Sequence, residues 1–210
     1  MTDYVWYASY GSNLLESRFL CYIQGGKPAG SSRTYSGCKD VTLPTGNRPH
    51  ELPYELYFAK KASVWNDGGV AFIDVATETE DKTLARKYRI TRSQFMELVQ
   101  QENNIPDTII LDLDQVKADK YLCFIDRGWY NTIVYLGDYE GEPIFTFTSS
   151  TLYEPNIKPD IAYLMTIIGG LKECHNLSDE SIMDYLYSKR GIRDMFDEEE
   201  LANCIRKSIR

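Results

Sequence analysis

The chain contains few of the residues on which many metal sites and catalytic triads depend. Its 210 residues include only two histidines, His50 and His175, which disfavours a histidine-rich metal site. Neither histidine lies in a recognisable motif, so a Ser-His-Asp triad is also disfavoured. The longest apolar stretch, residues 161–171, is broken by two glycines and is too short to span a bilayer.

The cysteines are scattered and odd in number, and no two of them form a Cys-x-x-Cys pair. This arrangement predicts reduced thiols in a cytoplasmic protein. Residues 1–3 lack the charged-then-apolar pattern that begins a signal peptide, which agrees with that location. The five cysteines are Cys21, Cys38, Cys123, Cys174 and Cys204.

Positive charge is also in deficit, with 23 lysines and arginines against 31 aspartates and glutamates, a net charge of −8. An acidic surface repels phosphate, so we expect neither nucleic acid nor an anionic membrane as partner. What is present instead is a 43% apolar composition with 16 tyrosines, which is typical of a globular protein. The length suits a single domain over residues 1–210, with a helical C-terminal region from about residue 159.

The spacing of apolar residues predicts strands in the middle of the chain and helices at its end. This organisation indicates the α+β class, as a small mixed β-barrel with flanking helices. A long irregular excursion over residues 27–53 interrupts the pattern, with a short strand near 40–43. The predicted strands are 4–7, 54–60, 70–75, 84–90, 109–116, 121–125, 132–136 and 144–148. The predicted helices are 14–23, 91–102, one from about 159, 179–189 and 198–207.

Between the first strand and the first helix lie Gly11, Ser12 and Asn13, which suit a tight turn and a helix N-terminus. Such a turn directs several backbone N–H groups at one point, where a carboxylate or a developing oxyanion binds. An ordinary strand-to-helix connection fits the same residues. The pattern alone leaves both interpretations open.

A carboxylate occupies the apolar face of the helix predicted over residues 91–102. Phe95, Leu98 and Val99 are spaced i, i+3 and i+4, and the next position on that face is Glu102. Partial burial there raises a carboxyl pKa toward the range that suits a general base at neutral pH. The alternative is that Glu102 lies beyond the buried face, in water. Tyr153 is a second candidate, either as a pocket hydroxyl or as a structural tyrosine.

Several motifs follow one another in a recognisable order. After the first strand comes Tyr10-Gly11-Ser12-Asn13-Leu14, with Arg18 in the helix that follows. Trp65 precedes Gly68-Gly69-Val70-Ala71, and Gln100-Gln101-Glu102 ends the predicted helix. In these motifs, and in its C-terminal region over residues 159–185, the chain resembles the gamma-glutamyl cyclotransferase-like family. It departs from that family in the length of the 27–53 excursion and in Asn103, where many members have glycine.

The resemblance implies release of 5-oxoproline and a free amine from a small-molecule γ-glutamyl substrate, without a metal or organic cofactor. It implies that Glu102 is the general acid/base, and that the turn holds the glutamyl carboxylate or stabilises the oxyanion. The implied substrate-binding residues are Tyr10, Gly11, Ser12, Asn13 and Leu14, to which the sequence itself adds Tyr153 as a candidate. Two alternatives stay open: a non-catalytic binding or regulatory protein on the same scaffold, and a different γ-glutamyl transfer or hydrolysis. Neither the leaving amine nor the oligomeric state follows from the sequence.

Overall fold

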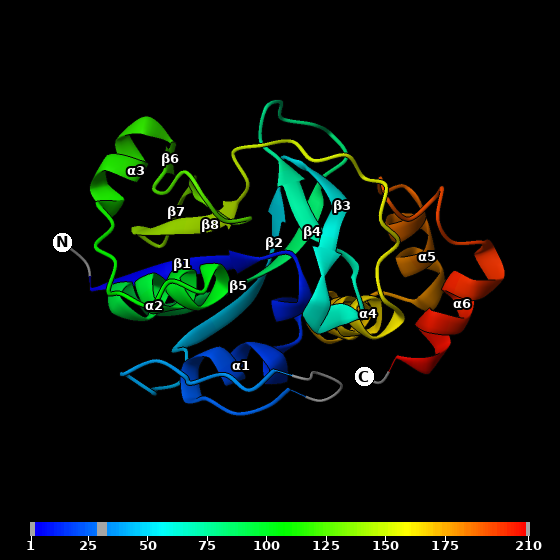
Figure 1. The fold of residues 1–210 in the computed structure, drawn as a ribbon, viewed down its shortest axis with the longest axis horizontal. Helices are drawn as coiled ribbons and strands as arrows, with labels where there is room; N and C mark the ends of the chain where they lie inside the picture. Colours follow the sequence, from blue (N-terminus) through cyan, green and yellow to red (C-terminus); the bar gives the residue numbers. More distant parts are fainter. Residues whose placement is uncertain (1–2, 29–32, 209–210) are drawn as a thin grey trace.

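The structure is a computed structural model that describes residues 3–28 and 33–208. Residues 29–32 of the predicted excursion, and the first two and last two residues of the chain, lie outside the described residues. Six strands of the described part form one mixed sheet in the order β2-β5-β1-β8-β7-β6 (Figure 1). These strands are β1 (Tyr4–Ser9), β2 (Gly46–Leu52), β5 (Thr83–Thr91), β6 (Tyr121–Cys123), β7 (Thr132–Tyr139) and β8 (Glu142–Thr148).

Two further strands, β3 (Glu55–Ala62) and β4 (Gly68–Asp74), form a separate antiparallel ladder. Short 3-10 turns occur as η1 (Ser12–Leu14) and η2 (Ser63–Trp65). The α-helices are α1 (Glu16–Gln24), α2 (Arg92–Asn103), α3 (Leu113–Asp119), α4 (Ile161–His175), α5 (Asp179–Tyr187) and α6 (Glu198–Lys207). None of the helices described in the two ranges has the length and apolar character needed to cross a membrane.

The central strand β1 is covered on both faces, which explains its nearly continuous apolar sequence. It runs antiparallel to β5 and parallel to β8. Val5 and Tyr7 face a core shared with helices α1 and α2. The alternate residues Trp6 and Ala8 face a second core, which β3, β4 and the C-terminal helices complete. Figure 1 shows α1 and α2 beneath the sheet and α4, α5 and α6 gathered beyond β3 and β4.

The α+β class with flanking helices is confirmed, although the sheet is not closed into a barrel. Strands β2 and β6 stand at opposite ends of the sheet order and are not neighbours in it. The β3–β4 ladder forms its own sheet and contributes to the second core through side-chain packing. A mixed open sheet with a packed hairpin therefore replaces the ring that we expected.

The strand predicted over residues 109–116 is wrong. Helix α3 begins inside it, because the Asp112 side chain caps the N–H groups of Asp114 and Gln115 at 3.1 and 3.0 Å. Leu111 and Leu113 are buried at alternate positions, which imitates a strand, whereas Val116 completes the helical spacing from Leu113.

The short strand expected near residues 40–43 is also wrong. The Asp40 carboxylate accepts the N–H of Thr42 at 3.0 Å, which forms a turn and leaves Val41 exposed. The strand of this segment is β2, six residues further on, although it contains Pro49. Strand β2 pairs only with β5 and is an edge strand of the sheet, which is the position in which proline is tolerated.

Helix α2 begins with a capping box. The Thr91 hydroxyl accepts the Gln94 N–H at 3.1 Å, and the Gln94 side chain accepts the Thr91 N–H at 3.0 Å. Phe95, Leu98 and Val99 are fully buried, as their spacing predicted. The helix ends one residue after Glu102, at Asn103. Glu102 thus extends from the last turn of a helix whose other apolar-face residues are anchored in the core.

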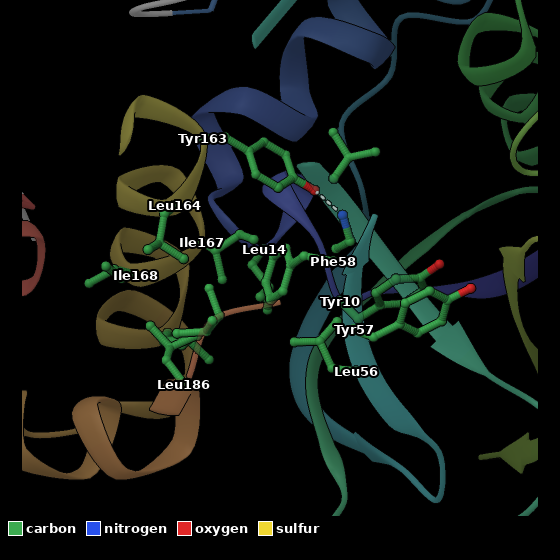
Figure 2. Close-up of a cluster of buried hydrophobic side chains, with 14 of the residues drawn as sticks. Tyr10, Leu14, Leu56, Tyr57, Phe58, Tyr163, Leu164, Ile167, Ile168 and Leu186 are labelled. Atoms are coloured by element: carbon green, nitrogen blue, oxygen red, sulfur yellow. Dashed lines mark hydrogen bonds between the residues drawn. The ribbon is translucent and has the colours of Figure 1, made fainter. Parts of the chain in front are cut away.

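The turn η1 rests on helix α4 at a close backbone approach. A Cβ at Gly170 would lie 2.5 Å from the carbonyl carbon of Leu14 and 2.6 Å from the nitrogen of Leu15, so no larger residue fits there. The Leu14 side chain lies against α4 residues such as Ile167, as Figure 2 shows. Helix α4 therefore holds the turn that follows β1 in place.

Candidate active site

A cavity of about 440 Å³ opens where the turn after β1 meets the end of α2 and the 3-10 turn η2. Its walls include Gly11, Ser12 and Asn13 from the turn, Glu102 from α2, and Trp65 from η2. Glu102 is the one carboxylate among its described lining residues, and these include no histidine or cysteine. In the part of the chain that the structure describes, no cluster of three or more His, Cys, Asp or Glu side chains is arranged to hold a metal ion.

Glu102 contacts the turn directly. The Asn13 side-chain amide donates a hydrogen bond to the Glu102 carboxylate at 3.2 Å. The main chain of Asn13 is held by β5, because the Tyr88 hydroxyl donates a hydrogen bond to its carbonyl at 2.9 Å. The predicted acid/base and the predicted turn, 89 residues apart in sequence, therefore form one hydrogen-bonded unit.

Burial raises the pKa of the Glu102 carboxyl above its ordinary value of 4.5. The Tyr22 hydroxyl and the Arg18 guanidinium are the leading opposing influences, followed by Arg33 and Asn13. The carboxyl thus combines a raised pKa with access to the cavity, which is the combination that a general base near neutral pH requires.

Two arginines approach the cavity from different segments. Arg18 of α1 donates from Nε to the Ser12 hydroxyl at 2.8 Å and from Nη2 to the Tyr35 hydroxyl at 2.9 Å. Arg33 donates from Nη2 to the main-chain carbonyl of Gln101 at 3.1 Å, next to Glu102. The cavity wall is consequently cationic beside Glu102, in a protein whose net charge is −8.

Tyrosine hydroxyls supply much of the remaining polarity. The Tyr163 hydroxyl of α4 accepts the Ala71 N–H at 3.0 Å (the dashed line in Figure 2), and the Tyr130 hydroxyl donates to the Ala71 carbonyl at 3.0 Å. Burial is the largest cause that raises the pKa of both hydroxyls. They therefore remain protonated and neutral at physiological pH.

Most, but not all, of the predicted site residues meet at this cavity. Tyr10, Gly11, Ser12, Asn13 and Glu102 line it. The lining does not include two others, Leu14 and Tyr153.

Leu14 is 1% exposed and packs in the core between the turn and helix α4. Its main-chain carbonyl accepts a hydrogen bond from Arg86 at 3.2 Å. The Tyr153 ring contacts Phe72 edge-on, at 5.3 Å between centroids, and lies under the Lys60 ammonium at 4.2 Å. The structure thus gives both residues contacts outside the cavity, where they support its walls.

Several cavity residues were not predicted as site residues. Arg18 and Tyr163 belong to motifs that carry the family resemblance, whereas Arg33, Tyr22 and Tyr130 belong to none of them. Arg18 had a usable signal, because an arginine within a helix that carries Phe19, Tyr22 and Ile23 on its buried face needs polar partners. Tyr22 and Tyr130 had no signal, since 16 tyrosines are spread along the sequence.

Comparison with known proteins gives one relative by sequence and several by structure. No protein-family model matches the chain. Histone deacetylase 5 of Arabidopsis thaliana is 35% identical over 198 residues, which are 87% of this chain and 30% of that protein. A solved gamma-glutamyl cyclotransferase superposes with a TM-score of 0.52 at 19% identity, over 97% of this chain and 99% of that one. An uncharacterized protein from Homo sapiens superposes with a TM-score of 0.52 at 19% identity, over 98% and 100% of the two chains.

The chain therefore has the fold of the gamma-glutamyl cyclotransferases, over nearly its whole length. The resemblance that its motifs suggested is confirmed at the level of the fold. The chain spans 30% of the curated relative that it matches, so the name of that longer protein describes no activity of this one.

The burial of Glu102 predicts a pH-dependent stability. Because its pKa is raised in the folded state, the folded protein binds a proton over a pH range in which the unfolded chain has released it. The free energy of unfolding should therefore fall as pH rises from the unfolded pKa through the folded one. Glu102→Gln removes this loss, so the variant should gain stability relative to the wild type as pH rises. Denaturant unfolding of both proteins at about pH 4 and about pH 7 measures the difference between their free energies of unfolding. The same difference at the two pH values would contradict the prediction.

Proposed function

We propose that the chain is a gamma-glutamyl cyclotransferase-type enzyme, which releases 5-oxoproline and a free amine from a γ-glutamyl compound. The observation that carries the proposal is the hydrogen bond between the Asn13 amide and the Glu102 carboxylate in a cavity of about 440 Å³. It joins the motif turn to a partly buried carboxylate whose pKa is raised by desolvation. The gamma-glutamyl cyclotransferase fold of the chain adds support.

The reaction is a ring closure within the substrate. The α-amine attacks the γ-carbonyl, a bond forms between that nitrogen and the γ-carbon, and the bond from the γ-carbon to the leaving nitrogen breaks. Glu102 accepts a proton from the α-amine and passes one to the leaving nitrogen, so that the amine departs neutral. Because both reacting groups belong to one molecule, holding it folded in the cavity removes a large part of the barrier.

The remaining walls bind and orient the substrate. In this proposal Gly11, Ser12 and Asn13 present their backbone N–H groups to the oxyanion that forms on the γ-carbonyl oxygen. Ser12 and Asn13 begin the 3-10 turn η1, and the first N–H groups of a helix have no acceptor within it. Tyr10 supports this wall, with its hydroxyl hydrogen-bonded to the Phe147 carbonyl at 2.8 Å. We also propose that the protein acts in the cytoplasm, since its five cysteines are unpaired.

The alternative is a binding or regulatory protein with the same cavity and no turnover, because a fold does not secure an activity. Incubation of the purified protein with a panel of γ-glutamyl amines and dipeptides separates the two. Detection of 5-oxoproline by mass spectrometry supports the cyclotransferase, whereas free glutamate indicates hydrolysis. Binding without any product, across the panel, would establish the binding protein instead.

A further inference from the structure

Two buried side-chain atoms in the cavity wall have no hydrogen-bond partner among the described residues, Asn13 Oδ1 and Arg18 Nη1. A buried polar atom without a partner costs about 1–3 kcal/mol, and native proteins leave few of them. One of the two is an acceptor and the other is a charged donor. Both residues line the same cavity, and a ligand that reached these atoms with groups of the opposite kind would satisfy both.

The Arg18 side chain is held in place by several contacts, but its Nη1 atom has no hydrogen-bond partner among the described residues. Its side chain is only 4% exposed, Nε and Nη2 are bonded to the Ser12 and Tyr35 hydroxyls, and its guanidinium lies 4.7 Å from the Trp65 ring centre. No carboxylate in the described part of the chain forms a salt bridge with it. Arg86, equally buried, is paired with the two carboxylates of Glu16 and Glu173. Arg18 is therefore a fixed guanidinium that interacts with the charge of Glu102 but has no carboxylate in direct contact with it among the described residues.

Asn13 and Glu102 present acceptors, which need a hydrogen-bond donor from a ligand. The Asn13 amide nitrogen is committed to the Glu102 carboxylate, which leaves its oxygen as an acceptor. Two acceptors, one of them a carboxylate, thus adjoin a cavity wall that also presents the unused Arg18 donor. A group that carries an ammonium and a carboxylate on the same carbon matches both requirements at once.

We infer that Arg18 Nη1 binds the α-carboxylate of the substrate while Asn13 Oδ1 and Glu102 receive its α-amino group. The inference rests on the proposed function and deepens it. It makes Arg18 the residue that selects substrates with an α-carboxylate beside the α-amino group. It assigns the substrate carboxylate to a side chain and not to the backbone of the turn. It also brings the attacking nitrogen to Glu102, the group that takes its proton.

The test compares two substrates that differ in one group. A γ-glutamyl amine carries the α-carboxylate, whereas the corresponding 4-aminobutanoyl amide lacks it and closes to 2-pyrrolidinone. The wild type should favour the glutamyl compound in kcat/KM by about 10- to 100-fold, which is the range for a hydrogen bond to a charged group. Arg18→Met should abolish most of this preference by lowering kcat/KM for the glutamyl compound alone. Arg18→Lys, which keeps the charge, should restore part of it.

A matched variant separates binding from support of the turn. Tyr35→Phe removes the hydroxyl that accepts from Arg18 Nη2 and leaves the charge and Nη1 in place. It should therefore keep the preference for the glutamyl compound, even where both rates fall. Equal losses on both substrates in Arg18→Met would overturn the inference, since that is the result of a merely structural arginine.

A binding measurement distinguishes failure of the inference from failure of the proposed function. Calorimetry with L-glutamate and with 4-aminobutanoate compares the same pair of head groups without any turnover. Weaker binding of L-glutamate by Arg18→Met, with that of 4-aminobutanoate unchanged, supports the inference even if the protein forms no 5-oxoproline. Equal binding of the two by the wild type, or no binding of L-glutamate, overturns it even if 5-oxoproline forms.

Discussion

Replacing Glu102 by glutamine is expected to lower kcat by about 10²–10⁴-fold, the usual contribution of a general acid or base. The amide keeps the size of the side chain and can still accept the hydrogen bond from Asn13, which joins the two residues at 3.2 Å. It cannot take a proton from the attacking amine. Because the wild-type carboxyl is partly buried and its pKa is raised by desolvation, the neutral amide should be tolerated without loss of folding.

The measurement is initial-rate formation of 5-oxoproline, on whichever substrate of the panel the wild type converts fastest. Glu97→Gln is the matched control, because Glu97 lies on the same helix α2 and outside the cavity lining, where it accepts the Lys39 N–H at 2.7 Å. This variant should keep the wild-type rate. Near-normal turnover by Glu102→Gln, with circular dichroism unchanged, would remove Glu102 from the proposed mechanism.

The second large effect is expected at Gly170, far from any reacting atom. A methyl group there would overlap the backbone of Leu14 and Leu15, which cannot move aside as a flexible side chain does. Gly170→Ala should therefore lower the free energy of unfolding by about 3 kcal/mol, the upper end of the usual cost of overpacking. The same overlap pushes η1 away from α4, so KM should rise as Asn13 moves relative to Glu102.

Chemical denaturation and steady-state kinetics on the same preparation test both expectations. Gly137→Ala is the control, because it adds the same methyl group where no atom lies within 4 Å. Its cost should be limited to the strain of a positive φ of 99°, about 1 kcal/mol, with no change in KM. If Gly170→Ala is no less stable than Gly137→Ala, the close approach of α4 to the turn does not constrain the site.

Elements with local signals were predictable from sequence. Helix α2 has its capping box between Thr91 and Gln94, and helix α6 has Asp197 as its cap, with the Asp197 carboxylate accepting the Glu200 N–H at 2.7 Å. Such contacts join residues three positions apart, so the pattern is complete within a short window. The wrong strand prediction over residues 109–116 also comes from a short window. The alternation of Leu111 and Leu113 fits a strand as well as the residues that lead into a helix.

The candidate site was predictable only in part. Helical spacing placed Glu102 on the buried face of α2, and the motif turn placed Asn13 after the first strand. Neither signal contains the contact between them. Leu14 belongs to the same motif but faces α4, because side-chain direction within a one-turn 3-10 helix depends on what packs beside it. Nothing in the sequence distinguishes Tyr153 from the other 15 tyrosines. Its contacts with Phe72 and Lys60, which place it outside the cavity lining, are known only from the structure.

The sequence by itself determined the α+β class, most of the helices and strands, and a carboxylate on an apolar helix face. These follow from hydrogen bonds and periodicities that extend over a few residues. Only the tertiary structure decided that the sheet stays open, that Asn13 meets Glu102, and that Arg18 enters the same cavity with one nitrogen unused. The physical reason is that a cavity and its charges arise from packing between distant segments, whose geometry no local pattern contains.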